Sequence, residues 1–130
     1  MVYSSWFWLV WLTLSGLSTS SLVRMAGGGG LRGSRGQTRG GDQHYQFLGI
    51  PFATPPTGDR RWRPPVPVSA WEGIREASVS APHCLQMPLR TPTKITGSED
   101  CLYLNVFTKS LDSAAKKPVL VFIPGGAFIA

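Results

Sequence analysis

Apolar residues gather in runs of element length along this chain, and two of the runs predict strands. Residues 102–108 alternate with β-branched and aromatic side chains, a pattern typical of a strand. Residues 118–123 are continuously apolar over strand length, as expected of a strand buried on both faces. We expect these two segments to be neighbouring strands of one sheet. A further short apolar strand begins at Phe47 and is stopped by Pro51.

Proline and glycine determine what lies between these strands. Eleven prolines and fifteen glycines interrupt almost every stretch after Gly27, so no long helix is expected. In residues 55–58, Pro-Pro-Thr-Gly, each proline fixes its own φ and biases the residue before it away from helix. The chain should therefore be irregular and rich in loops between its strands.

The apolar run at residues 6–17 has a different character. It holds roughly a dozen residues, too few to cross a bilayer core of about 30 Å as a helix. Small residues follow at positions 18–21, where a peptidase would cut, which is the pattern of a secretory signal peptide. Residues 1–5 lack the usual Lys or Arg, and a membrane anchor or a buried strand are the alternatives. We expect residues 1–21 to be a signal peptide and the protein to be secreted, without a further membrane span.

Charge is uneven along the chain, whose formal net charge is +6. Residues 24–41 hold four arginines and no acid, hence +4, whereas residues 42–130 hold nine basic against seven acidic residues, hence +2. Three Arg-Gly pairs invite comparison with RNA-binding segments, but the run is short, lacks aromatic residues and follows a secretion signal. We therefore expect no nucleic-acid partner, and we interpret residues 22–46 as a Gly/Arg-rich linker or an N-terminal hairpin.

Cys84 and Cys101 are the only cysteines of the chain. A single pair of cysteines in a secreted protein is most simply one disulfide. Two free thiols or part of a metal site are the alternatives, but no histidine lies near with ligand spacing except the adjacent His83. We expect neither a metal nor a cofactor.

Two blocks of sequence are specific enough to indicate a family. The first runs in order through Gly-Ile-Pro-Phe-Ala at 49–53, Pro-Pro-Thr-Gly at 55–58, the Arg61-Trp62 pair and Trp-Glu-Gly at 71–73. The second is the seven-residue run Glu-Asp-Cys-Leu-Tyr-Leu-Asn at 99–105. Together they resemble the type-B carboxylesterase and cholinesterase family, and the longer run is far more specific than any spaced glycine motif.

This resemblance carries expectations about fold and structural residues. It implies an α/β-hydrolase fold, an α/β class of which this chain holds only the N-terminal strands, with residues 47–130 as an incomplete N-terminal part of the domain. It implies that Cys101 pairs with Cys84. It also implies that Arg61 and Glu99 form a buried salt bridge, the alternative being a solvated charge at Arg61.

The loop between the two cysteines bears on the substrate. In cholinesterases this loop carries a tryptophan whose π face holds a quaternary ammonium group. Residues 85–100 contain no Trp, Tyr or Phe, so this loop offers no cation–π partner. The resemblance is therefore to general carboxylesterases rather than to a choline esterase.

A glycine turn follows the last apolar run directly, as Pro124-Gly125-Gly126-Ala127. In α/β-hydrolases a His-Gly-Gly-Gly-type turn at this place supplies a backbone N–H to the oxyanion of the tetrahedral intermediate. Carried over by position, Gly126 and Ala127 are the candidate donors of the oxyanion hole. Pro124 stands in place of the usual His or Tyr, and Ala127 in place of the third glycine, yet both candidate N–H groups remain. An ordinary glycine turn after a strand is the alternative.

The catalytic groups of such an enzyme are not found in this sequence. No Gly-x-Ser-x-Gly nucleophile elbow occurs, and His44 and His83 both precede the oxyanion segment, whereas the order in this fold is Ser, acid, His. We interpret both as surface histidines. The resemblance implies a serine hydrolase of small-molecule carboxylic esters, acting through an acyl-enzyme, with the 130-residue chain inactive by itself. A non-catalytic cholinesterase-like adhesion protein and an inactive truncated product are the alternatives. Poor folding is also expected, because the strand at 119–123 would have an unpaired edge.

Overall fold

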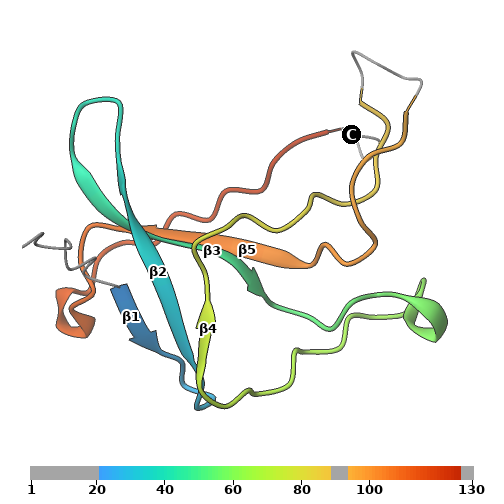
Figure 1. Ribbon diagram of the computed structural model, residues 1–130, viewed down its shortest axis with the longest axis horizontal. Coiled ribbons are helices and arrows are strands. Elements are labelled where there is room, and N and C mark those ends of the chain that lie inside the picture. The colour runs from blue at the N-terminus through green and yellow to red at the C-terminus, as the bar shows by residue number, and fades with distance from the viewer. Residues whose placement is uncertain (1–20, 89–93, 127–130) are drawn as a thin grey trace, which may run out of the picture.

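Five β-strands and two short 3-10 helices form the described part of the computed structural model, which is residues 21–88 and 94–126 (Figure 1). In chain order the elements are β1 Ser21–Arg24, β2 Gly30–Gln37, β3 Gln43–Pro51, η1 Gly58–Arg60, β4 Ile74–Glu76, β5 Tyr103–Thr108 and η2 Ser113–Ala115. No α-helix occurs in these residues, in line with the frequent prolines and glycines. The described chain is a strand-rich unit with long irregular connections.

The strands form one sheet in the order β1-β2-β3-β5, with consecutive members antiparallel. The short β4 pairs with β2 in parallel, and Figure 1 shows it lying beside the lower half of β2. Residues 22–46, interpreted above as a linker or a hairpin, form β1, β2 and the first part of β3. The turn between β2 and β3 is closed by the Thr38 N–H, which donates to the Asp42 carbonyl at 2.9 Å, and by Gly41 at φ +93°.

Glycine in β2 lets the strands approach one another closely. A Cβ on Gly33 would collide with the backbone carbonyl oxygen of Gln46 and with the ring of Phe47. Arginine and glycine alternate here, so the arginine side chains leave the sheet at the positions between the glycines. Arg32 forms an ion pair of 2.6 Å with Glu76 of β4, and both side chains are exposed. The Arg-Gly pattern thus serves the pairing of β2 in this structure.

A small apolar core lies where β2, β3 and the segment after β4 meet. Its buried members are Leu31, Phe47, Ile50 and Ala77, which are 1–6% exposed. Trp71 packs against this cluster, and the guanidinium of Arg75 lies 4.6 Å from the centre of its ring. Burial of a few side chains of this kind contributes about 1.5–3 kcal/mol each. So few buried residues leave the sheet dependent on each of them.

The family-like run at 99–105 supports a bulge in β3. The pairing of β3 with β5 is irregular between Phe47 and Ile50, where Gly49 adopts φ +68°. The Gly49 N–H donates to the Asn105 side-chain oxygen at 2.9 Å, and the neighbouring Leu48 N–H donates to the Ala77 carbonyl at 2.8 Å. These bonds satisfy the backbone groups that the bulge takes out of the ladder.

The strand predicted at 102–108 is confirmed as β5, and the one predicted from Phe47 is confirmed as part of the longer β3. The strand predicted at 118–123 is wrong for this structure. These residues follow η2 without joining the sheet, and the five side chains from Val119 to Ile123 are 77–93% exposed (Figure 1). The expected pairing with β5 is therefore also absent from the described residues. A strand of this apolar character needs partners on its edges and cover on both faces, and the described residues supply neither.

The predicted signal peptide, residues 1–21, lies outside the described residues except for Ser21, which begins β1 and is 3% exposed. Within residues 21–88 and 94–126, no helix is long and apolar enough to cross a membrane.

Candidate functional site

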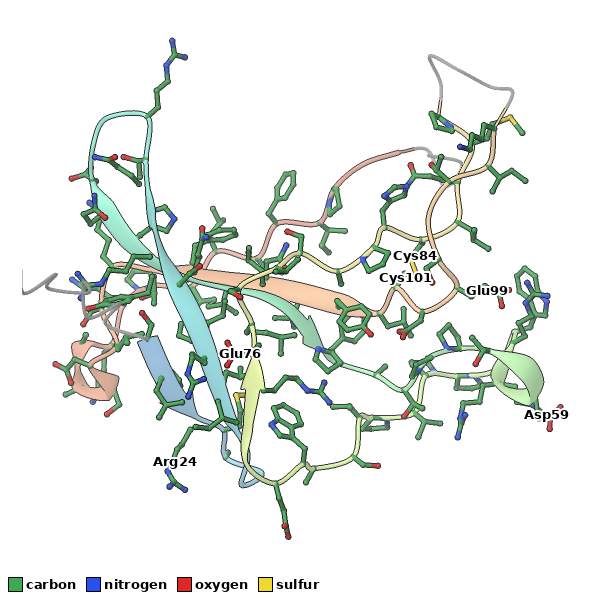
Figure 2. All side chains as sticks on the ribbon, in the orientation of Figure 1. Arg24, Asp59, Glu76, Cys84, Glu99 and Cys101 are labelled. Atoms are coloured by element: carbon green, nitrogen blue, oxygen red, sulfur yellow. A yellow bond between two sulfur atoms is a disulfide. The ribbon has the colours of Figure 1, made fainter. Side chains whose placement is uncertain are left out.

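A disulfide joins Cys84 to Cys101, as the sequence predicted, with the two Cα atoms 4.9 Å apart. Figure 2 shows this bond between the loop that precedes the second block and the chain that enters β5. Cys101 lies two residues before β5 begins. The disulfide therefore fastens the loop at 85–100 to the edge of the sheet, and the alternatives of free thiols or a metal site are excluded for these two residues.

The base of this loop is also closed by hydrogen bonds. Gln86 and Thr96 exchange two backbone bonds of 2.9 and 3.0 Å, and the His83 ring bonds the Thr96 hydroxyl at 3.0 Å. Gly97 lies opposite at φ +104°, where a Cβ would collide with the carbonyl of Cys84. A side chain at Gly97 would push the two arms of the loop apart. The loop is thus a small closed hairpin with the disulfide at its base.

Removing the disulfide should cost about 3 kcal/mol of unfolding free energy, because the bond closes a loop of 17 residues in the unfolded chain. Replacing Cys84 and Cys101 together by serine tests this in urea denaturation followed by tryptophan fluorescence. Reductant should bring the wild-type chain to the stability of the double variant and leave that variant unchanged. A double variant as stable as the oxidised wild type would show that the disulfide does not hold this unit together.

Arg61 and Glu99 form the predicted ion pair, which joins the region after η1 to the residues around the disulfide. In Figure 2, Glu99 lies between Cys101 and the η1 loop. The expected burial of this pair is wrong, since the two side chains are 58% and 36% exposed. In the described part of the chain nothing covers the pair on its outer side. Exposed pairs of this kind contribute about 0–1 kcal/mol, well below the cost of breaking a buried pair.

A cavity of about 480 Å³ lies between the disulfide and the segment that follows the apolar run. His83 and Gln86 line it from the loop, Tyr103 and Asn105 from β5, and Pro124 from the far side. A hydrogen bond to the Asp100 carboxylate, together with burial and the charge of Asp100, raises the pKa of Tyr103. Its phenol is therefore neutral at physiological pH and acts as a donor. The lining carries no side chain that is charged at that pH, apart from any protonated His83.

Pro124 and Gly125 are exposed and Gly126 is half-buried, at the end of the unpaired apolar run. A Cβ on Gly125 would meet no atom within 4 Å, so its neighbourhood is open in this structure. Ala127, the second candidate donor, lies outside the described residues. The two histidines lie apart, because His83 is on the cavity and His44 packs at 5.8 Å on Phe107 at the other end of β5. No group of three or more His, Cys, Asp or Glu that could hold a metal occurs among residues 21–88 and 94–126.

Comparison with known proteins decides what these features belong to. A sequence profile described as "Carboxylesterase family" matches residues 19–130, which include both blocks of sequence, the disulfide and the glycine turn. The chain belongs to the carboxylesterase family. The strand-rich unit is consistent with the N-terminal part of a carboxylesterase, and the segments that sequence analysis singled out fall within the match.

Several curated carboxylesterase relatives carry enzyme names. The chain is 42% identical over 109 residues to fumonisin B1 esterase of Sphingopyxis macrogoltabida, a match of 82% of this chain and 19% of the relative. It is 40% identical over 103 residues to juvenile hormone esterase of Tribolium castaneum, covering 78% and 18%. It is 38% identical over 120 residues to cocaine esterase of Oryctolagus cuniculus, covering 83% and 23%. The chain thus spans about a fifth of the length of the relatives that it matches.

Proposed function

We propose that this chain is the N-terminal part of a secreted serine carboxylesterase, and that the whole protein hydrolyses small-molecule carboxylic esters. The observation that carries the proposal is the carboxylesterase match over residues 19–130, in which the relatives named above are esterases. The sequence contains no Gly-x-Ser-x-Gly elbow, so the nucleophile, acid and histidine would come from the part of the family domain that this chain does not span.

The proposed role of this chain in the chemistry is to hold the oxyanion. When the serine oxygen attacks the ester carbonyl, the carbonyl oxygen becomes negative, and backbone N–H groups of Gly126 and Ala127 would donate to it. The alcohol then leaves, and water hydrolyses the acyl-enzyme through a second tetrahedral intermediate held by the same donors. Small residues suit this role because the substrate must approach the backbone closely. The methyl group of Ala127 would narrow the space for bulky acyl groups.

The proposed fold of the whole domain is the α/β-hydrolase fold. In that fold residues 118–123 would become a buried strand once further strands cover its edges and faces, and the glycine turn would follow the end of that strand. The continuous apolar character of 118–123 supports this proposal, since such a run is typical of strands buried on both faces.

The proposed location is outside the cell. Residues 1–21 have the length and apolar centre of a secretory signal peptide, and the Cys84–Cys101 disulfide suits an oxidising compartment. The loop that this disulfide closes has no aromatic side chain, which favours general ester substrates over choline esters.

Secreted protein that carries the complete carboxylesterase domain tests the proposal by hydrolysis of p-nitrophenyl acetate. We expect turnover that is abolished by a serine-directed phosphonate, with one phosphonate bound per chain. Acetylthiocholine at equal concentration should be a poor substrate. Folded protein without phosphonate-sensitive turnover of the aryl ester would contradict the proposed activity.

A further inference from the structure

The most exposed large apolar stretch of the described chain is the run from Val119 to Ile123. All five of its side chains are at least three-quarters exposed, and no charged residue occurs between Pro118 and Gly126. The backbone of this run makes no hydrogen bond to another part of the described chain. An extended apolar segment with unpaired backbone groups on both edges is a ready partner for another strand.

The same molecule carries an unpaired sheet edge. Among the described residues, β5 pairs only with β3, so its second edge has no strand beside it. Leu104, Val106 and Phe107 of β5 are also exposed apolar residues. The cavity lined by Tyr103 and Pro124 separates the start of β5 from the end of the apolar run. The run therefore does not cover the edge of β5 in its own chain.

We propose that two copies of this chain associate by strand exchange, with residues 119–123 of each copy pairing with the free edge of β5 of the other. A second copy is the occupant that the structure itself supports, because each chain holds both halves of the contact. Reciprocal pairing satisfies two runs and two edges at once, and the two-fold arrangement is closed. Backbone hydrogen bonds provide the pairing, and burial of the apolar side chains drives it. This inference does not depend on the proposed esterase activity.

Sedimentation velocity of the purified chain over a hundredfold range of concentration tests the association. The wild-type chain should pass from one to two chain masses. Val121→Lys should remain at one chain mass at every concentration, because a charge in the run opposes burial between strands. Val79→Lys is the matched control, since Val79 and Val121 are both 77% exposed and Val79 lies outside both the run and β5. This control should associate like the wild type.

A mixing experiment identifies which segments pair. Phe107→Lys blocks the β5 edge at a position that is 60% exposed, and alone it should stay at one chain mass. Mixed with Val121→Lys, it should form a two-chain species, because one intact run and one intact β5 edge then remain. Circular dichroism checks that both variants keep the strand signal of the wild type, and Val106→Lys replaces Phe107→Lys if that variant loses it.

Three results would overturn the proposal. A wild-type chain that stays at one mass at every concentration would leave the run to another occupant, such as the remainder of the carboxylesterase domain. A Val121→Lys variant that associates like the wild type would exclude the run as the contact. A mixture of the two blocked variants that stays at one mass, or a wild-type mass that grows without limit, would exclude reciprocal pairing with β5.

Discussion

Replacing Ala127 by proline in the protein with the complete carboxylesterase domain is expected to lower kcat about 10²–10³-fold. Proline has no backbone N–H, so the substitution removes one of the two proposed donors to the oxyanion. KM should change little, since this donor acts on the charge that develops in the transition state. Steady-state hydrolysis of p-nitrophenyl acetate measures both constants.

Ala127→Gly is the control for this first prediction. It keeps the N–H and restores the glycine that the family usually has at this place, so kcat should stay within a few-fold of the wild type. With bulky acyl groups kcat/KM should rise, because the methyl group no longer occupies the site. If Ala127→Pro keeps wild-type kcat in a folded enzyme, the oxyanion role of this turn is wrong.

Replacing Phe47 by alanine is expected to destabilise the chain by about 3–5 kcal/mol. Phe47 is 4% exposed and belongs to a core cluster of only four buried residues. Its ring also lies against the glycine surface of β2 at Gly33. No neighbouring large side chain is available to fill the cavity, so the loss should approach the total stability of the unit.

Urea denaturation followed by tryptophan fluorescence measures the effect of this second substitution. Phe52→Ala is the matched control, since it removes the same ring from a position that is 48% exposed, one residue beyond the end of β3. The control should cost well under half of the loss at Phe47. Equal losses at the two positions would show that the cluster around Phe47 is not the core of the unit.

Local pattern was enough to predict β5 and the apolar part of β3 from the sequence. In both segments the side chains themselves favour a strand, and a proline ends β3 where it was expected. The strands β1 and β2 carry little such pattern, because glycine and arginine replace apolar residues. Their pairing depends on the close approach that Gly33 permits, which is a contact between distant segments. A hairpin was accordingly only one of two interpretations of residues 22–46.

The errors concern burial rather than chemistry. The run at 118–123 has the composition of a buried strand, but composition cannot supply the partners that burial requires. Arg61 and Glu99 meet as the resemblance implied, yet the same lack of cover leaves them exposed. The disulfide was predictable because two cysteines leave one intramolecular pairing. The bulge at Gly49 and its bond to Asn105 were not predicted, since nothing in the local sequence links residues so far apart.

The central claim is that this chain opens a catalytic carboxylesterase, and reading the transcript through and past the codon for Ala130 tests it most directly. The account predicts an open frame that continues into Gly-x-Ser-x-Gly, followed by an acidic residue and then a histidine, over a length comparable to the relatives. A frame that continues through the family domain with the serine replaced, or a stop codon directly after Ala130, would contradict it.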